Sequence, residues 1–327
     1  MKVYLTNTIE NKTVSVTVPG SKSESNRLLI LKKIYPNIFL HNLSNCDDTI
    51  ALSRGIEAKN GIVDVHHAGT AMRFLTSFFA SKKDVELTLT GSKRMQERPI
   101  KILVDTLRLI GADISYVRNN GYPPLKINGK ELVLDSLSID ANISSQYISA
   151  LMLIAPSLPR GLTITLKNKI TSVPYIKMTL ELLYRIGICC TLNNNIIKIT
   201  STKTIKDVTI NIESDWSSAS YYYSLVALSE HLEITLKTFK RDSIQGDSKV
   251  VDFYKKIGVD TIFNETDNSI TLRKNQKKIE NFLSFNLIET PDIAQTIAVT
   301  CFGLGISCEL TGLKTLKIKE TDRLLAL

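Results

Sequence analysis

The sequence lacks the features that would suggest membrane insertion or secretion. It contains no run of about eighteen apolar residues, the length that a membrane-spanning helix needs. Residues 1–5 (MKVYL) enter a strand-like pattern without the apolar core of a signal peptide. We therefore expect a cytoplasmic protein without a membrane span.

Aromatic residues are also scarce, at 7% of the chain. They are not interleaved with basic residues, as a surface that stacks nucleic-acid bases requires. The net charge of +9 comes from lysines scattered along the chain, with small clusters such as residues 274–278 and no arginine-rich arm. This pattern favours small anionic substrates over nucleic acid as binding partners.

Paired cysteines are missing as well. The five cysteines do not have the spacing of a metal site, and an odd count with Cys189 and Cys190 adjacent is a poor basis for a disulfide framework. We expect reduced, buried thiols of a cytosolic protein and no metal site.

What the sequence does contain is a polar stretch, residues 19–27 (PGSKSESNR), between a strand-like segment and an apolar run. Ser21 or Ser23 can cap a helix there, and Ser23 and Arg27 then share one helix face. Free N–H groups, hydroxyls and the cations Lys22 and Arg27 at one helix start form a candidate anion site. Taken alone, the stretch is explained as well by an ordinary capped helix.

Two kinds of segment recur along the 327 residues, a length that suits two domains. Small polar clusters open apolar helices at Gly69, Ser144, Ser217 and Asp292, with successive starts 73 to 75 residues apart. Amphipathic helices end in Ile-Gly at residues 111, 187 and 258, where glycine suits a helix C-terminus. Short alternating strands lie between them. We predict an α/β (α+β) protein built from repeated globular units.

The repeat also gives an expectation for the end of the chain. Residues 319–327 should begin another amphipathic helix, and the glycine and strand that follow such helices elsewhere do not appear. We expect a fragment whose second domain is incomplete.

Nine segments, in order and in register, resemble the EPSP synthase family, the 5-enolpyruvylshikimate-3-phosphate synthases of the shikimate pathway. These segments are residues 19–27, 68–73, 94–100, 144–146, 172–175, 215–220, 245–247, 291–292 and 319–323. The resemblance covers essentially the whole chain.

The resemblance implies a two-domain enolpyruvyl transferase fold of repeated βαβαββ units, with the active site between the domains. The first domain would cover residues 20–214. The second would combine residues 1–19 with 215–327, so that the chain crosses between domains twice.

The implied reaction moves the carboxyvinyl group of phosphoenolpyruvate onto the 5-hydroxyl of shikimate 3-phosphate and releases phosphate, a step in chorismate and aromatic amino-acid biosynthesis. It proceeds by addition and elimination and requires no metal or organic cofactor. The implied partners are these two small molecules, with no nucleic acid and no membrane, and the protein would be a monomer.

By the same resemblance, each ligand has its own set of residues. Those for phosphoenolpyruvate are Lys22, Gly69, Arg98, Gln146 and Arg323. Those for shikimate 3-phosphate are Ser23, Arg27, Ser144, Ser145, Gln146, Ser172, Tyr175, Asp292, Thr315 and Lys319. The implied catalytic residues are Lys22, Asp292 and Glu320, with Asp292 taking the proton of the 5-hydroxyl and Glu320 and Lys22 serving the protonation side. Singly, most of these residues are equally well explained as helix caps or solvated charges.

The sequence departs from the family pattern at several positions. His67 stands where the family often has Asn, Phe74 replaces a frequent Pro, and Thr315 replaces an Asn that commonly meets the shikimate ring. The family's C-terminal segment supplies another Arg and a Lys to phosphoenolpyruvate. Without these two contacts, each worth roughly 1.5–3 kcal/mol, we expect this chain to be catalytically weak. The space beside Gly69 is also the one that glyphosate uses in sensitive members of the family, so we expect the complete enzyme to be a glyphosate target.

Three alternatives remain open at this stage. The related transferase acting on UDP-N-acetylglucosamine opens with a different segment and uses a loop cysteine that this sequence does not match. A nucleic-acid-binding module is suggested only by the net charge. A fragment that binds shikimate 3-phosphate without turning it over has the same motifs as an enzyme.

Overall fold

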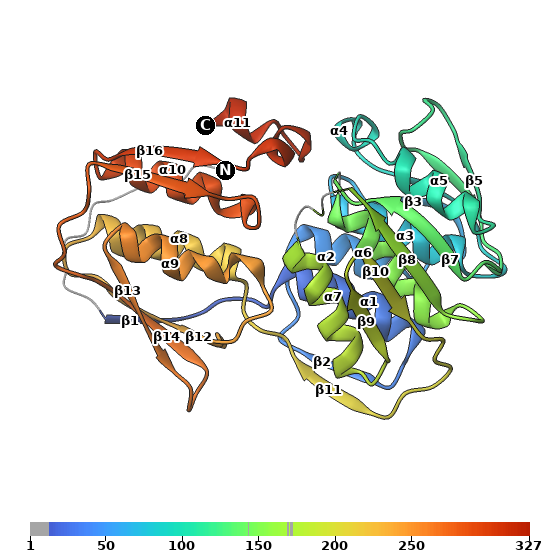
Figure 1. Cartoon of the computed structure of the whole chain (residues 1–327), viewed down its shortest axis with the longest axis horizontal. Helices are drawn as coiled ribbons and strands as arrows, with labels where there is room; N and C mark the ends of the chain where they lie inside the picture. Colours follow the sequence, from blue (N-terminus) through green and yellow to red (C-terminus); the bar gives the residue numbers. More distant parts are fainter. Residues whose placement is uncertain (1–12, 143, 169, 171–172) are drawn as a thin grey trace.

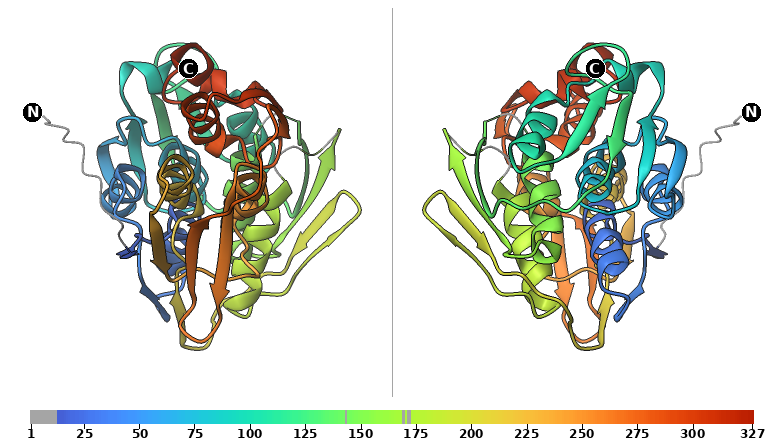
Figure 2. Two further views of the ribbon diagram at one scale, coloured as in Figure 1. Left: turned by 90° about the vertical axis from the view of Figure 1, so that its left-hand side faces the viewer. Right: turned by 90° about the vertical axis from the view of Figure 1, so that its right-hand side faces the viewer.

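The computed structural model describes residues 13–327 except 143, 169, 171 and 172. One predicted site residue, Ser172, and the first twelve residues of the predicted second domain therefore lie outside the described residues. The chain forms two lobes side by side (Figure 1). In the end-on views of Figure 2, helices lie together in the interior and strands lie toward the outside.

The first lobe contains two units with the same order of elements. In each unit a parallel strand pair encloses a buried helix, and an amphipathic helix leads into an antiparallel hairpin. The first unit, with sheet order β3-β4-β6-β5, consists of β3 (Asn60–Asp64), α3 (Gly69–Ala80), β4 (Glu86–Thr90), α4 (Lys93–Gln96), α5 (Lys101–Leu109), β5 (Asp113–Tyr116) and β6 (Leu125–Asn128). The second, with order β7-β8-β10-β9, consists of β7 (Ser136–Asp140), α6 (Ser145–Ile154), η1 (Ala155–Ser157), β8 (Leu162–Lys167), α7 (Val173–Arg185), β9 (Cys190–Asn193) and β10 (Ile196–Ile199).

The second lobe repeats this arrangement once, with sheet order β1-β12-β14-β13. Its elements are β1 (Thr13–Thr17), α8 (Trp216–Leu228), β12 (Glu233–Lys237), η2 (Gly246–Lys249), α9 (Val250–Lys256), β13 (Val259–Asn264) and β14 (Ser269–Lys274).

Two further parallel strand pairs complete the described fold. In the first lobe β2 pairs with β11, and in the second β15 pairs with β16. The elements of these parts are α1 (Lys22–Ile34), β2 (Ile38–His41), α2 (Asp47–Gly55), β11 (Val208–Asn211), β15 (Phe282–Asn286), η3 (Pro291–Ile293), α10 (Ala294–Gly303), β16 (Ser307–Thr311), η4 (Lys314–Ile318) and α11 (Arg323–Ala326).

Two strands exchange places between the lobes. β1 precedes α1 in the chain, yet it pairs with β12 of the second lobe, Thr13 opposite Glu233. β11 precedes α8, yet it pairs with β2 of the first lobe, Val208 opposite Ile38. The two crossing segments meet where Gly20 bridges Ser214. The Ser21 N–H donates to the Glu213 carbonyl oxygen at 2.8 Å in the same place.

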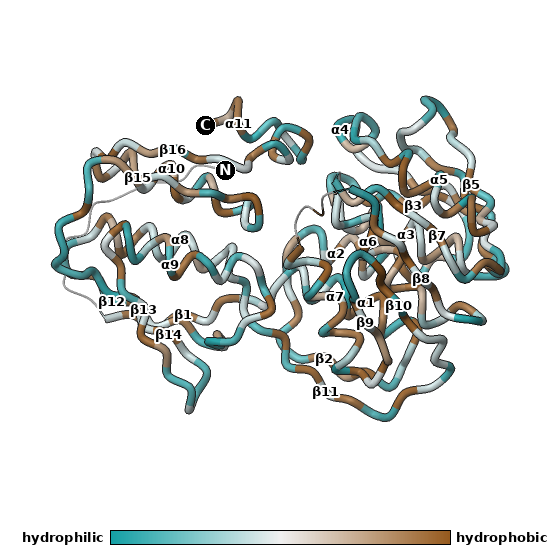
Figure 3. The backbone as a smooth tube through the Cα atoms, in the orientation of Figure 1, coloured by the Kyte–Doolittle hydropathy of each residue, from teal (hydrophilic) through white to brown (hydrophobic). Residues whose placement is uncertain are grey.

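The buried apolar side chains divide into two clusters. One runs from Leu28 to Ile212, and the other joins Val18 to residues from Trp216 to Leu316. Hydrophobic residues lie along the central helices and strands of both lobes, and polar residues lie at the hairpin tips (Figure 3). These two cores support our proposal that the domains are residues 20–214 and residues 1–19 with 215–327, as far as these are described.

Local signals in the sequence explain where several helices start and stop. The Ser21 side chain caps α1 by accepting from the Glu24 N–H. Gly111, Gly187 and Gly258 follow α5, α7 and α9 with positive φ angles, as predicted for helix ends. The prediction of a mixed α/β fold is confirmed.

Two expectations need correction. The C-terminal helix begins at Arg323 rather than near residue 319, because the Asp322 side chain caps the N–H groups of Leu324 and Leu325. All five thiols are free, but Cys301 alone is buried and Cys189 is exposed at the start of a hairpin. Among the described residues, none of the helices is both long and apolar enough to cross a membrane.

Candidate active site

A cavity of about 400 Å³ lies between the lobes, and side chains from both of them line it. Every predicted site residue that the structure describes is among its lining residues. These are Lys22, Ser23, Arg27, Gly69, Arg98, Ser144, Ser145, Gln146, Tyr175, Asp292, Thr315, Lys319, Glu320 and Arg323. A neighbouring hollow of about 500 Å³ shares Lys22, Asp292 and Arg323 and extends toward Asp215.

Lys22 lies at the first turn of α1, where the two lobes meet. Its backbone N–H donates to the Asp215 carboxylate, the N-cap of α8, at 3.1 Å. Burial by itself lowers the pKa of the Lys22 ammonium, but the carboxylates of Asp48, Asp292 and Asp215 outweigh that effect and raise it. Lys22 is therefore a cation held by carboxylates at the centre of the site.

Arg27, one turn further along α1, is buried with only 2% of its surface exposed. Its guanidinium donates to Thr179 Oγ1 at 2.8 Å, to Ser149 Oγ at 3.0 Å and to the Ser23 carbonyl at 2.8 Å. Burial lowers its pKa to about 10. Its hydrogen-bond partners in the described part of the chain are neutral oxygens, so an anion in the cavity can still balance its charge.

Gly69, at the start of α3, allows the Arg98 side chain to approach the helix closely. A Cβ atom on Gly69 would lie 2.5 Å from Arg98 Nη1 and 2.7 Å from Nη2. Arg98 is 8% exposed, and burial together with the charge of Arg73 lowers its pKa to about 10. The structure thus places a poorly compensated guanidinium over a helix N-terminus, an arrangement that favours an anion.

The polar cluster at the start of α6 faces the same cavity. Ser144 is the N-cap residue, and its hydroxyl oxygen accepts from the Gln146 N–H at 3.3 Å. Ser145 is buried beside it. The Gln146 side-chain amide lies 3.5 Å from Thr70 Oγ1 of α3, so it reaches across between the two helix starts.

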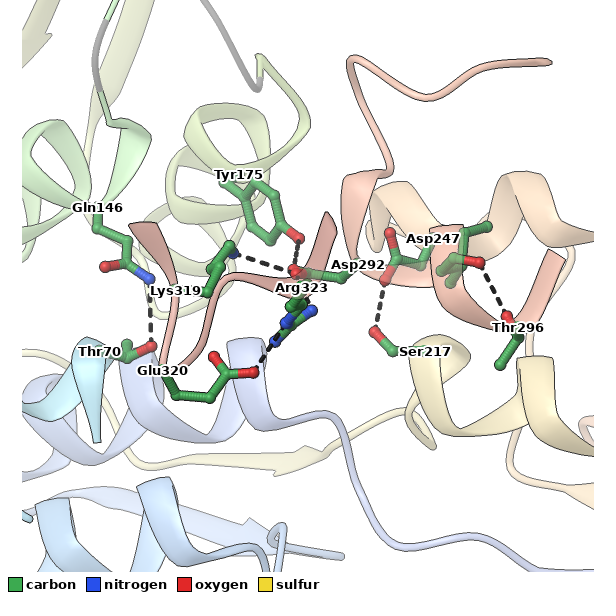
Figure 4. Close-up of polar contacts among 11 residues, drawn as sticks. Thr70, Gln146, Tyr175, Ser217, Asp247, Asp292, Thr296, Lys319, Glu320 and Arg323 are labelled. Carbon is green, nitrogen blue, oxygen red and sulfur yellow. Dashed lines mark hydrogen bonds and ion pairs between the residues drawn. The ribbon is translucent and has the colours of Figure 1, made fainter. Parts of the chain in front are cut away.

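Asp292 of the second lobe connects the two lobes inside the cavity (Figure 4). Its Oδ1 accepts from Lys319 Nζ and from Arg323 Nη1, both at 3.1 Å, and its Oδ2 accepts from the Tyr175 hydroxyl at 3.1 Å. Burial alone would raise the pKa of Asp292, but Lys319, Lys22 and Arg323 outweigh it and hold that pKa well below its usual range. Asp292 is ionised in this arrangement.

Glu320 is paired with a cation, whereas an acid catalyst must carry a proton. Its carboxylate accepts from Arg323 Nε at 2.7 Å. Burial favours the protonated form, but the hydrogen bond from Arg323 outweighs it and lowers the pKa of Glu320. In the structure as it stands, Glu320 is therefore a carboxylate rather than a proton donor.

Two of the three positions that depart from the family pattern, His67 and Thr315, also lie at the cavity, whereas Phe74 is buried in the core of the first lobe. Thr315, in η4, contributes to its wall. His67 lies between its neighbour His66, with the two Nδ1 atoms 2.7 Å apart, and Asp47, whose Oδ2 is 3.6 Å from His67 Nε2.

Sequence reasoning missed two polar residues of this cavity. Asp48 raises the pKa of Lys22 and its Oδ1 lies 3.4 Å from the Thr70 N–H. Arg73 is 4% exposed and donates to the carbonyls of Gly69 and Pro99 at 3.2 Å. Asp48 lies near the start of α2 and Arg73 near the start of α3, each close to a predicted site residue. That closeness is the signal in the sequence that could have identified them.

The site gathers cations from both lobes around one ionised carboxylate. Lys22, Arg27 and Arg98 come from the first lobe, and Lys319 and Arg323 come from the second. Such a set suits small ligands that carry phosphate and carboxylate groups. Within the described ranges, the His, Cys, Asp and Glu side chains form no group of three or more that is arranged to hold a metal ion.

Comparisons with known proteins agree with this arrangement. The family model described as EPSP synthase (3-phosphoshikimate 1-carboxyvinyltransferase) matches residues 40–327. A 3-phosphoshikimate 1-carboxyvinyltransferase of Bacteroides fragilis strain YCH46 is 42% identical over 325 residues, which cover 99% of this chain and 78% of that protein. The enzyme of the same name from Shewanella piezotolerans is 33% identical, covering 98% of this chain and 80% of that protein.

The fold is similar to a solved structure as well. The structure of EPSP synthase from Acinetobacter baumannii matches with a TM-score of 0.74 at 20% identity, covering 96% of this chain and 76% of that one. That likeness concerns the fold alone, whereas the family model and the curated relatives concern the sequence. The chain belongs to the EPSP synthase (3-phosphoshikimate 1-carboxyvinyltransferase) family.

Proposed function

We propose that this chain binds shikimate 3-phosphate and phosphoenolpyruvate in the cavity between its lobes and transfers the carboxyvinyl group between them. The single observation that carries the proposal is the convergence of Lys22, Lys319 and Arg323 on Asp292. This is the arrangement that a proton acceptor needs beside two anionic substrates.

In the addition step, the 5-hydroxyl oxygen of shikimate 3-phosphate bonds to C2 of phosphoenolpyruvate, and the hydroxyl proton passes to Asp292. A second proton is added to C3, which converts the methylene into a methyl group. In the elimination step, the C2–O bond to phosphate breaks, C3 loses a proton, and the vinyl double bond forms again. Proton transfers of this kind require one group on each side of the reacting carbons.

The pKa of Asp292 supports its assignment as the base once substrates are present. Lys319 and Arg323 lower that pKa while they contact its carboxylate. Phosphate and carboxylate groups of the ligands compete for the same two cations, and each contact transferred to a ligand raises the pKa of Asp292. Substrate binding would therefore turn a weak base into a stronger one.

The assignment of Glu320 to the protonation side depends on the same exchange. Arg323 holds Glu320 as a carboxylate at 2.7 Å. If Arg323 turns to phosphoenolpyruvate, Glu320 loses this partner and its pKa rises, so that it can carry the proton that C3 needs. Lys22, with a raised pKa and a position on the cavity wall, is the other candidate proton donor.

We infer that the partners are these small anions, with a monomeric, cytoplasmic protein and no nucleic acid. The cations that the structure brings together line a cavity of about 400 Å³, which fits ligands of this size and not a polynucleotide groove. Binding of RNA or DNA that falls steeply with salt, with no response to shikimate 3-phosphate, would support the nucleic-acid alternative.

Calorimetric titration with shikimate 3-phosphate, with unphosphorylated shikimate as the comparison ligand, tests the proposal. We expect saturable binding that requires the phosphate and that weakens about tenfold in Ser145→Ala, the loss of one hydrogen bond to a charged group. Ser77→Ala is the matched control, because Ser77 is a buried helix serine of α3 outside the cavity lining. Equal binding of shikimate and its phosphate ester would overturn the proposal.

A further inference from the structure

Asp247, in η2 of the second lobe, is a buried carboxyl group that the proposed reaction does not use. Only 4% of its surface is exposed, and it is not among the lining residues of either hollow. Its Oδ2 accepts from Ser217 Oγ at 2.5 Å. Its Oδ1 is buried without a hydrogen-bond partner among the described residues.

The surroundings of Asp247 favour its protonated form. An ionised carboxylate needs several donors when it is removed from water, and among the residues that the structure describes one hydroxyl serves the whole group. Burial, followed by the negative charge of Asp292, raises the pKa of Asp247 to about 7, and Asp215 adds to the effect. The hydrogen bond from Ser217 and the charge of Lys319 act in the opposite direction.

Asp247 lies beside the proposed base Asp292, and its carboxylate contacts Ser217 in the close-up view (Figure 4). The charged and titratable groups that face it come from four elements: Asp292 of η3, Asp215 at the N-cap of α8, Lys319 after η4, and Tyr175 of α7, whose pKa it helps to raise. It therefore responds to the same groups that hold the substrates.

The loop that carries Asp247 is held firmly against the other lobe. A Cβ on Gly246 would lie 2.9 Å from Pro174 Cβ of α7 and 3.1 Å from the Glu289 carbonyl oxygen. The Gln245 side chain accepts from the Trp216 N–H at 3.1 Å and donates to the Ser214 carbonyl at 2.9 Å. Asp247 thus has a fixed position at the junction of the two lobes.

We propose that Asp247 is a positioning residue for Asp292: the buried carboxyl group of Asp247 takes up a proton when an anionic substrate binds in the cavity. The proton comes from solvent, joins the carboxylate of Asp247, and returns to solvent when the ligand leaves. In this way Asp292 stays the ionised member of the pair, and the added negative charge of the ligand does not meet two carboxylates. The inference rests on the proposed binding of shikimate 3-phosphate.

A structural role alone has a different signature. If Asp247 merely accepts a hydrogen bond from Ser217, an asparagine in its place keeps that hydrogen bond. The number of protons taken up on ligand binding then stays the same. If Asp247 titrates as proposed, asparagine removes the exchange and leaves the hydrogen bond in place. Asp247→Asn therefore separates the two roles.

The first experiment measures proton uptake on binding of shikimate 3-phosphate, by calorimetry at pH 7.5 in two buffers of different ionisation enthalpy. If the bound anion raises the pKa of Asp247 by about one unit, the protein takes up about half a proton. We expect this uptake to vanish in Asp247→Asn, while affinity at pH 6 stays within about twofold of the unmodified chain. We also expect affinity to fall from pH 6 to pH 8.5 about tenfold less in the variant, since one pKa unit corresponds to a factor of ten.

Two controls make the comparison specific. Asp252→Asn removes an exposed carboxylate of α9 in the same lobe, and proton uptake should be unchanged. Ser217→Ala removes the hydrogen bond that lowers the pKa of Asp247. The pH range in which binding of shikimate 3-phosphate is accompanied by proton uptake should therefore shift upward in Ser217→Ala. The titration of the ligand's own phosphate is common to all variants and cancels in the difference.

A second measurement needs no ligand and so separates this inference from the proposed function. Because a raised pKa means that the folded state binds more protons than the unfolded state, the unmodified chain should lose stability relative to Asp247→Asn as the pH rises from about 4 to 7. Unfolding in urea at several pH values measures this difference. Parallel stability curves, or unchanged proton uptake in Asp247→Asn, would overturn the inference. Absence of binding by the unmodified chain, with the stability difference present, would instead count against the proposed function.

Discussion

Tyr175, on α7 of the first lobe, donates its hydroxyl hydrogen to Asp292 of the second lobe over 3.1 Å. The phenol is buried, and burial followed by the charge of Asp292 raises its pKa well above the usual range, so it stays a donor. This contact between the two lobes orients the carboxylate that we assign as the base.

We expect Tyr175→Phe to weaken shikimate 3-phosphate binding about tenfold, because a hydrogen bond to a charged group contributes roughly 1.5–3 kcal/mol. Calorimetry measures the affinity directly. Tyr184→Phe is the matched control, since Tyr184 lies on the same helix with 71% of its surface exposed. Equal affinities in the two variants would show that the hydroxyl of Tyr175 does not contribute to the site.

Gly69→Ala should act through Arg98. The new methyl group would lie 2.5 Å from Arg98 Nη1, so the guanidinium must move away from the start of α3. We expect phosphoenolpyruvate affinity to fall about tenfold, shikimate 3-phosphate affinity to stay unchanged, and inhibition by glyphosate to be relieved.

A double-mutant cycle checks that mechanism. If the methyl group acts by displacing Arg98, Gly69→Ala should have little further effect in an Arg98→Ala background. Additive losses in the double variant would mean that the methyl group interferes with the ligand itself.

Arg27→Lys should destabilise the fold although it conserves the charge. Lysine cannot donate to Thr179, Ser149 and the Ser23 carbonyl together, and it loses the stacking of the guanidinium carbon at 5.4 Å from the Phe74 ring centroid. We expect a loss of about 2–4 kcal/mol in the free energy of unfolding. Urea denaturation, with the partly exposed Arg185→Lys of α7 as control, measures it; a loss below about 0.5 kcal/mol would contradict this account.

The parts of the fold that could be predicted from the sequence are those whose signals act over a few neighbouring residues. Helix starts and ends are encoded within a few residues, so Ser21 and the glycines after α5, α7 and α9 could be found. The pairing of Thr13 with Glu233 joins residues 220 positions apart in the sequence (233 − 13), and spacing alone could not assign it. The prediction that the chain crosses between the two domains came from the resemblance to a known family.

The candidate site shows the same division. The predicted residues lie in contiguous motifs, and the cavity brings them together. Their pairing was not predictable, because the hydrogen bond from Tyr175 to Asp292 joins residues of different lobes, which meet only after the lobes have packed. The burial of Asp247 depends on that packing too. Asp247 belongs to the recognised segment 245–247, yet the sequence alone could not assign it a role.

Glu24, in the first turn of α1, is a second carboxyl group whose burial the sequence conceals. It is 1% exposed, and its Oε1 has no hydrogen-bond partner in the described part of the chain. Glu213, at the crossing between the lobes, is held by four donors, among them Trp216 Nε1 and the Lys240 N–H, both at 2.9 Å. Burial and the charge of Glu213 raise the pKa of Glu24 to about 8, although Arg185 and Lys240 oppose the shift.

Glu24→Gln should therefore stabilise the chain in a pH-dependent way. Between the usual glutamate pKa of about 4.5 and the raised value of about 8, the folded state binds a proton that the unfolded state has released, so stability falls as pH rises through this window. Glutamine carries no charge, so the variant should gain about 2–4 kcal/mol over the unmodified chain at pH 8 and almost nothing at pH 4. Urea unfolding at several pH values measures the difference, with the exposed Glu230→Gln as the control that removes a charge without changing burial. A gain that is the same at pH 4 and pH 8 would show that Glu24 is not protonated in the folded chain, and that the like-charge contact with Glu213 at the lobe junction does not limit stability.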